Sequence, residues 1–160
     1  MRIFQSGPRA GFTLLEVLVV VLILGILTSI ALPNYRRSLE RTRVAETQSL
    51  LRAIYDSRER GAMERNYDSY SVMPSSSKFG FNKLDITVKG TFSGTNKTQL
   101  TTANFRYDMS STPLTATAIK GDYTGAKVSY DGQQFTCTNG TSGEARKACT
   151  AWGSSTWNER

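Results

Sequence analysis

FTLLEVLVVVLILGILTSIAL, residues 12–32, is an almost uninterrupted apolar run. It contains 16 residues of Ala, Val, Ile, Leu or Phe. As a helix with a rise of ~1.5 Å per residue it would be roughly 31 Å long, which matches the hydrocarbon core of a bilayer. The sequence therefore predicts a membrane-spanning helix close to the N-terminus.

The flanks of this run indicate that it is retained in the mature chain. A secretory signal peptide has a shorter apolar region followed by a small-residue cleavage site, whereas this run is full length and ends at Pro33 and Asn34. The preceding residues 1–11, MRIFQSGPRAG, are polar and include a Gly-Pro dipeptide that disfavours helix. We expect this leader to be cytoplasmic, although four Arg follow the run and only two precede it, so a positive-inside count alone favours the opposite orientation.

Glu16 is an ionisable residue within the apolar run. At mid-bilayer a carboxylate costs ~2.5–3.5 kcal/mol on insertion scales, while the 15 Leu, Ile, Val and Phe residues of the run contribute roughly 5–9 kcal/mol toward insertion. Insertion is therefore still favoured. Position alone leaves two explanations open: Glu16 extends to the interfacial water, or it has a function inside the membrane.

The composition excludes several kinds of catalytic and metal site. The chain has no His and only two Cys, which removes Ser or Cys catalysis with a His base and the common His-containing zinc sites. Asp131, Glu144 and Glu159 are too far apart in sequence to suggest a calcium site. We therefore expect no enzyme activity, no catalytic residue, no cofactor and no metal.

The formal net charge is +7, and loss of Arg2 and Arg9 with the leader would reduce it to +5. A basic surface attracts nucleic acid, anionic lipid or acidic polymers without distinguishing among them. DNA is thus admitted as a partner but has no specific support. The Arg residues between 36 and 43 fit either a solvated helix face or contacts with headgroups and acidic groups of packed subunits.

Helical periodicity continues beyond Pro33. Val44, Thr47, Leu51, Ile54 and Arg58 form one stripe that can cover a core. Gly61 is the expected C-terminal stop. On the exposed side, opposite charges spaced by four residues predict ion pairs worth ~0.3 kcal/mol each, namely Arg52–Asp56–Arg60 and Arg36–Glu40.

The remainder of the chain predicts a loop followed by an antiparallel sheet. Residues 62–83 lack periodicity and mix Tyr, Ser, Gly and Pro. Apolar residues then recur with period two at Leu84, Ile86 and Val88; at Phe105 and Tyr107; and at Leu114, Ala116 and Ala118. Residues 127–130 and 133–137 flank Asp131-Gly132, which predicts a hairpin with a two-residue turn. The expected fold is α+β, with a long helix packed on about four antiparallel strands.

GFTLLEVLVVVLILGILTSIALPNY, residues 11–35, resembles the signature of the type IV pilin and pseudopilin superfamily. The shared features are a short basic leader ending in Gly, then Phe, an acidic residue four positions later, and an apolar helix. Ala10 departs from the usual Lys or Arg before that Gly, although Arg9 is adjacent. The resemblance implies that a prepilin peptidase cuts after Gly11 and N-methylates Phe12.

The same resemblance implies an assembly role for Glu16, whose carboxylate would meet the Phe12 amine of a neighbouring subunit. A buried charge that is costly alone becomes tolerable when it is paired. Gly25 and Pro33 fall where such pilins have a locally extended stretch of helix. A single Pro kink explains these two residues equally well.

Cys137 and Cys149 are the two cysteines, and the resemblance places them outside the cytoplasm, where a disulfide forms readily. Such a bond would close a loop of ~13 residues and contribute roughly 3 kcal/mol. The alternative is two reduced, separately buried thiols. Trp152 and Trp157 either pack back on the sheet, which we favour, or form an exposed contact surface.

These observations predict the following division: leader 1–11, membrane and polymerisation helix 12–33, amphipathic helix 34–61, connecting loop 62–83, and sheet domain with a C-terminal disulfide 84–160. The implied function is a structural subunit of a type IV pilus used in adhesion, twitching motility or DNA uptake. The alternative is a pseudopilin of a type II secretion system. The implied partners are further copies and minor pilins in a filament, the prepilin peptidase, an inner-membrane assembly platform and the membrane. The implied location is the inner membrane, spanned once with the sheet domain periplasmic, and then an extracellular pilus.

Overall fold

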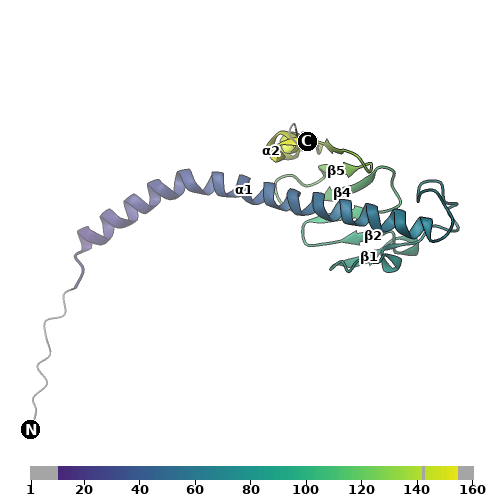
Figure 1. Ribbon diagram of the computed structural model, residues 1–160. Coiled ribbons are helices and arrows are strands. Elements are labelled where there is room, and N and C mark those ends of the chain that lie inside the picture. Colours follow the sequence, from purple (N-terminus) through teal and green to yellow (C-terminus); the bar gives the residue numbers. More distant parts are fainter. Residues whose placement is uncertain (1–10, 142, 155–160) are drawn as a thin grey trace, which may run out of the picture. The chain divides into compact units, whose positions relative to one another are not determined.

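The computed structural model describes residues 11–141 and 143–154, and its elements follow in chain order (Figure 1). The helices and strands are α1 Leu14–Met63, β1 Thr91–Ser93, β2 Gln99–Thr101, β3 Phe105–Asp108, β4 Leu114–Ala118, β5 Lys127–Tyr130, β6 Phe135–Thr138 and α2 Ala148–Trp152. Short 3-10 turns lie at Phe81–Lys83, Thr95–Lys97 and Gly143–Lys147. The chain divides after Ser38 into two compact units. Helix α1 contributes to both units, which are described separately.

The first unit is the N-terminal part of α1. Every side chain between Gly11 and Ser38 is exposed, so this part of the helix has no apolar partner within the chain. Leu, Val and Ile are good or tolerated helix formers, and the run contains a single Gly and no Pro before Pro33. The helix continues through Gly25 and Pro33.

The second unit, from Leu39 onward, is built on the remaining turns of α1. Its buried positions repeat every three or four residues and confirm the predicted stripe: Val44, Thr47, Leu51, Ile54, Ser57, Arg58, Gly61 and Ala62. This stripe packs against the inner face of the sheet, where Leu100, Tyr107, Leu114 and Val128 are buried. In the view of Figure 1 the labelled strands lie on both sides of the helix, with β4 and β5 above it and β1 and β2 below it. The core of the molecule is therefore the layer between α1 and the sheet.

The sheet has six antiparallel strands in the order β1-β2-β3-β4-β5-β6, so each strand pairs only with its neighbours along the chain. The inner face alternates with an outer, polar face, as in β4, where Leu114, Ala116 and Ala118 are buried and Thr115 and Thr117 are half-buried. The predicted α+β class is confirmed, but the predicted number of about four strands is wrong. Strands β1 and β2 were missed because TFS and QLT are three-residue segments without apolar periodicity.

The period-two segment Leu84, Ile86 and Val88 is not a strand. Its three apolar side chains are half-buried against the core while Asp85 and Thr87 are exposed. The alternation therefore reports an irregular segment that lays one face on the core. It does not imply hydrogen bonds to a neighbouring strand.

The β5–β6 hairpin is confirmed, but its connection is longer than the predicted two residues. Tyr130 pairs with Phe135, which leaves four residues between the strands. The Asp131 carboxylate accepts hydrogen bonds from the backbone N–H of Gln133 and Gln134 at 2.9 and 2.8 Å. The Asp131 backbone N–H also donates to the Gln134 carbonyl at 3.4 Å, so side-chain and backbone bonds together close the connection.

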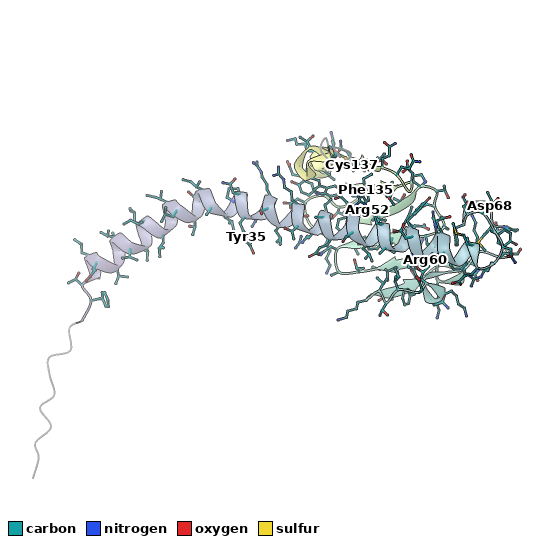
Figure 2. All side chains as sticks on the ribbon, viewed as in Figure 1. Tyr35, Arg52, Arg60, Asp68, Phe135 and Cys137 are labelled. Carbon is teal, nitrogen blue, oxygen red and sulfur yellow. A yellow bond between two sulfur atoms is a disulfide. The ribbon has the colours of Figure 1, made fainter. Side chains whose placement is uncertain are left out.

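Helix α1 passes the predicted stop and ends at Met63, with Gly61 buried inside it. A Cβ at Gly61 would lie 2.7 Å from Cζ of Phe79, so close packing accounts for this glycine. The predicted ion pairs along the exposed side are also wrong. Arg60 pairs with Asp85, Glu40 pairs with Arg43, and Arg52 lies over the ring of Phe135 (Figure 2).

Trp152 in α2 is 4% exposed and packs against the rings of Phe105 and Tyr123, which confirms the predicted packing of this residue. Arg41 donates a hydrogen bond to the carbonyl of Ala151 at 3.1 Å, which ties α1 to α2 within the second unit. Trp157 and the leader residues 1–10 lie outside the described residues.

Candidate functional site

The apolar surface of the first unit surrounds the whole helix. Phe12 and Leu14 are 82% and 83% exposed, and residues on every side of the helix down to Leu32 are more than two-fifths exposed. By length and composition this helix can cross a membrane, and none of its most apolar window is buried within the chain. A surface of this kind is stable only when lipid or other protein covers it.

Thr13 and Glu16 form the beginning of α1. The Thr13 hydroxyl accepts a hydrogen bond from the backbone N–H of Glu16 at 3.2 Å, and the Thr13 carbonyl accepts one from Val17 at 3.3 Å. Thr-Leu-Leu-Glu is the pattern of a helix N-terminal capping box, in which Thr satisfies a backbone donor and the acid lies in the first turn. The sequence alone therefore contains a signal for a helix that begins directly after Thr13.

The position of Glu16 in the first turn has an electrostatic consequence. The backbone dipoles of a helix leave partial positive charge at its N-terminus, which favours a carboxylate there. The side chain is nevertheless exposed. Glu16 therefore presents a charge on an otherwise apolar surface, and a partner cation from outside the chain can reach it.

Gly11 and Phe12 precede the helix and are both exposed. The peptide between them lies in non-helical backbone two residues before Leu14. A peptidase must bind an extended, accessible chain, and this arrangement meets that requirement. Cleavage at this peptide and methylation of Phe12 stay predictions.

Hydroxyl side chains bond the backbone around the predicted helix break. Thr28 donates to the carbonyls of Leu24 and Gly25 at 2.7 and 3.1 Å, and Ser29 donates to Ile26 at 2.7 Å. Pro33 has no N–H to offer the Ser29 carbonyl, so one backbone bond is missing from the helix. A Cβ at Gly25 would meet nothing within 4 Å. Helix is therefore weaker here than elsewhere, while its opening in a filament stays a prediction.

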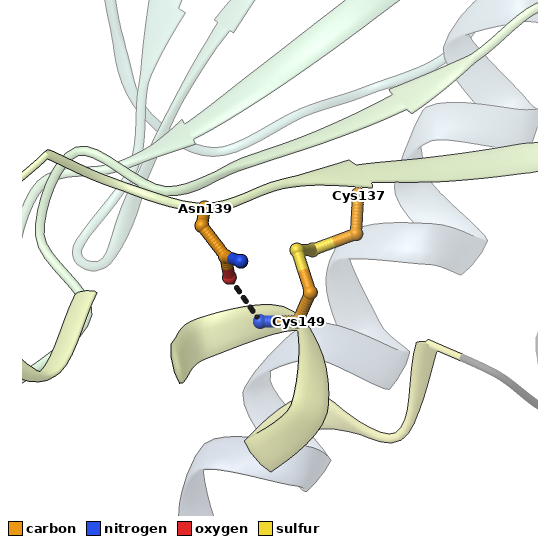
Figure 3. Close-up of a disulfide and its surroundings, with 3 residues drawn as sticks. All are labelled: Cys137, Asn139 and Cys149. Atoms are coloured by element: carbon orange, nitrogen blue, oxygen red, sulfur yellow. Dashed lines mark hydrogen bonds between the residues drawn. A yellow bond between two sulfur atoms is a disulfide. The ribbon is translucent and has the colours of Figure 1, made fainter. Parts of the chain in front are cut away.

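Cys137 and Cys149 form a disulfide with a Cα–Cα distance of 5.6 Å (Figure 3). It joins edge strand β6 to α2. Beside it, the Asn139 side-chain oxygen accepts a hydrogen bond from the Cys149 backbone N–H at 2.9 Å. Asn139 thus satisfies a donor at the start of α2, a role that the sequence did not reveal because the two residues are ten positions apart.

Arg58 is the main charged group inside the core. It is 1% exposed, and its guanidinium donates to the carbonyls of Met109 and Ser111 at 3.3 and 3.4 Å. It also pairs with Glu59 at 3.1 Å and lies over the rings of Tyr55 and Tyr70. Its donors are turned toward structural acceptors inside the core, so Arg58 stabilises packing.

A second ion pair anchors the segment before β1. Nε and Nη2 of Arg60 contact the two oxygens of Asp85 at 2.9 Å each, and the Ser57 hydroxyl also bonds Asp85. The hydrogen bonds from Arg60 and then Ser57 lower the pKa of Asp85 to about 2. Within the described residues, no group of three or more His, Cys, Asp or Glu side chains could hold a metal ion.

Residues 7–32 match the family described as the prokaryotic N-terminal methylation motif. This match and the exposed apolar helix fit a membrane-anchored precursor of the prepilin class. The match covers the predicted leader junction together with the whole apolar run, residues 12–32.

Similar proteins are pilins and fimbrial proteins. The type IV major pilin protein PilA of Myxococcus xanthus (strain DK1622) is 39% identical over 72 residues, which are 44% of this chain and 32% of that protein. A fimbrial protein of Pseudomonas aeruginosa is 30% identical over 92 residues, which are 58% of each chain. The chain thus aligns with between about one third and three fifths of the length of these relatives. No solved structure is significantly similar to it. The motif and the relatives support a type IV pilin.

Proposed function

We propose that this chain is a structural subunit of a type IV pilus, made as an inner-membrane precursor and polymerised through its N-terminal helix. The observation that carries the proposal is an apolar helix, exposed on all sides, with one carboxylate in its first turn. Lipid can cover the apolar surface before assembly, and the helices of neighbouring subunits can cover it afterwards. Catalysis is not required.

Processing supplies the partner for Glu16. Cleavage after Gly11 by a prepilin peptidase would create an amine on Phe12, four residues from Glu16. A carboxylate and an ammonium group buried together among apolar helices stabilise each other, whereas either one left alone is strongly penalised. Pairing between subunits therefore favours one axial register of the filament.

The second unit fits an extracytoplasmic, extracellular role. A disulfide persists in an oxidising compartment and is rare in the cytosol. Both named relatives are pilin or fimbrial proteins, which favours a pilus over a secretion pseudopilus. The filament would include minor pilins and be built by a membrane platform.

The test is Glu16→Ala in cells that express this chain as their pilin, with Glu46→Ala as the matched control. Glu46 is an exposed carboxylate of the second unit. We expect Glu16→Ala to accumulate in the membrane at the wild-type level, because removing a charge eases insertion by ~2.5–3.5 kcal/mol at most. Filaments counted by electron microscopy should fall at least about tenfold, while Glu46→Ala forms them normally.

Two results would contradict the proposal. One is wild-type piliation in Glu16→Ala. The other is an intact mass of filament subunits that still includes residues 1–11, since the expected mature chain begins at methylated Phe12.

A further inference from the structure

The basic stretch that directly follows the apolar run of α1 is not neutralised by the chain itself. Arg36 and Arg37 are exposed, and neither forms an ion pair with another described residue. The nearest acid along the chain is Glu40, whose carboxylate is already paired with Arg43. Even with Glu40 counted, four Arg and one Glu leave residues 34–43 with a net charge of +3. The chain therefore leaves positive charge here for a partner to neutralise.

The depth of these two cations follows from the helix on which they lie. Arg36 and Arg37 come four and five residues after Leu32, the last residue of the apolar run, which is ~6 and ~7.5 Å of helix at ~1.5 Å per residue. Headgroups add about 5–7 Å to each side of the ~30 Å hydrocarbon core of a bilayer. When the apolar run spans a membrane, both guanidinium groups therefore lie among the headgroups.

Tyr35 lies at the same level and supports this placement. Its side chain is 65% exposed on the surface of α1 (Figure 2). Tyr is enriched where a membrane helix leaves the hydrocarbon, since its ring is apolar and its hydroxyl is polar. An Arg next to such a position can lay its stem along apolar surface while its guanidinium extends into the headgroups. The order of apolar run, Tyr35, Arg36 and Arg37 thus follows the polarity of a membrane surface.

Phosphate is the headgroup chemistry that a guanidinium recognises. The planar fork of Arg can donate two parallel hydrogen bonds to phosphate oxygens. Each basic residue near an anionic membrane surface also strengthens binding about fivefold. We propose that Arg36 and Arg37 bind the headgroup phosphates of anionic phospholipid at the point where α1 leaves the bilayer.

A second copy of the chain is a poorer source of anions while both copies are in the membrane. The exposed acids in the rest of α1 are Glu46 and Asp56. Glu46, the nearer one, follows Arg37 by nine residues, which is ~14 Å of helix. Two copies that span one bilayer hold identical residues at the same depth, so each brings Arg36 and Arg37 beside the same cations of the other. Lipid phosphate is then the anion within reach, and a neighbour's acids require an axial shift.

Lipid contacts of this kind have a consequence for the precursor. They hold the apolar run at one depth, and they must be broken when a subunit leaves the membrane. The inference therefore rests on the membrane-anchored precursor of the proposed function, but not on its filament.

The test measures which lipid stays on the full chain in neutral detergent micelles. The micelles contain equal amounts of phosphatidylglycerol, which is anionic, and phosphatidylcholine, which has no net charge. Native mass spectrometry counts the molecules of each lipid that remain bound to the protein. The main variant is Arg36→Gln with Arg37→Gln. Its control is Arg106→Gln with Lys127→Gln, which removes the same charge from the outer face of the sheet, where these two exposed residues align through Thr117.

We expect the wild-type chain to retain phosphatidylglycerol over phosphatidylcholine by at least about fivefold. Arg36→Gln with Arg37→Gln should lower this preference at least about threefold, while the control variant keeps it. Arg36→Lys with Arg37→Lys preserves the charge and should keep most of the preference, which separates loss of charge from a disturbed helix. Thermal unfolding of each variant establishes that the second unit is retained.

Three outcomes would overturn the proposal. The wild-type chain could retain both lipids equally, or both Gln variants could lose the preference equally, which would reduce the effect to net charge. The Arg36 and Arg37 variant could also keep the preference, and loss of filaments from cells that express it would then assign these cations to acids of a second copy. Because no filament takes part in the lipid measurement, its failure leaves the proposed assembly role standing. Normal piliation in Glu16→Ala likewise leaves this inference standing.

Discussion

Arg58 is the residue whose removal should most disturb the second unit. The change Arg58→Ala deletes a buried cation, leaves the Met109 and Ser111 carbonyls without their donor, and opens a space between two tyrosine rings. Breaking a buried pair by removing one partner costs ~3–5 kcal/mol. We expect a loss of about 3 kcal/mol in the free energy of unfolding, measured by urea titration of the full chain in detergent.

Arg106→Ala is the comparison for Arg58→Ala, because Arg106 is an exposed arginine of the same unit. It should change the free energy of unfolding by less than about 0.5 kcal/mol. A loss below about 1 kcal/mol in Arg58→Ala would show that water or a rearranged side chain replaces the guanidinium.

The ion pair of Asp85 predicts a dependence of stability on pH. The folded pKa of Asp85 is about 2, below the ordinary value of 3.8, because hydrogen bonds from Arg60 and Ser57 favour the carboxylate. A lowered pKa means that the stabilisation is complete above pH 3.8 and is lost as the pH falls from 3.8 through about 2. Because the pair is half exposed, the effect is small.

Asp85→Asn tests this assignment. The melting temperature of the wild-type chain should exceed that of the variant at pH 6. The difference should shrink as the pH falls from 3.8 to about 2. A difference that stays constant down to pH 2 would assign the stabilisation to packing instead of charge.

At the scale of elements, α1 offers the same substitution in two settings. Ala is favoured over Gly in a helix by ~1 kcal/mol. In Gly61→Ala the new Cβ would lie 2.7 Å from the Phe79 ring, and overpacking of this kind costs ~1–3 kcal/mol. In Gly25→Ala the new methyl meets nothing within 4 Å.

We therefore expect Gly61→Ala to lower the free energy of unfolding of the second unit by about 1 kcal/mol, while Gly25→Ala leaves it unchanged. Urea titration followed by near-ultraviolet circular dichroism measures both. Equal stability of the two variants would mean that Phe79 moves aside without cost.

The elements differ in how far sequence alone could predict them. Helix α1 and its buried stripe were predictable because 3.6-residue periodicity persists over many turns. Strands β3 to β6 were predictable because apolar residues alternate on them. Strands β1 and β2 were not, since each has three residues and one large apolar side chain, which is too few to show alternation.

At the scale of the whole molecule, the candidate site was predictable where it is local in sequence. Gly11, Phe12 and Glu16 lie within six residues, so the motif could be recognised without coordinates. Contacts between distant segments could not be predicted in this way. Arg60 meets Asp85, and Asn139 meets Cys149, only because the chain folds back on itself.

The outer face of the sheet illustrates the same limit. Arg106 and Lys127 are 21 positions apart and have no shared motif. Their alignment depends on the register of β3, β4 and β5. The sequence predicts these strands but not how their residues pair. Residues that are aligned only by strand register cannot be recognised as neighbours until every intervening strand is assigned.

The order of the strands bears on how the second unit can form. Because each strand pairs with the one made just before it, the sheet can grow hairpin by hairpin in the order of synthesis. Helix α1 is already complete when β1 appears, so its buried stripe can receive each hairpin in turn. Pairing between neighbours keeps loop closure short and favours rapid folding. Because Cys149 lies in α2, the last element in chain order, the disulfide with Cys137 can form only after all six strands have been made.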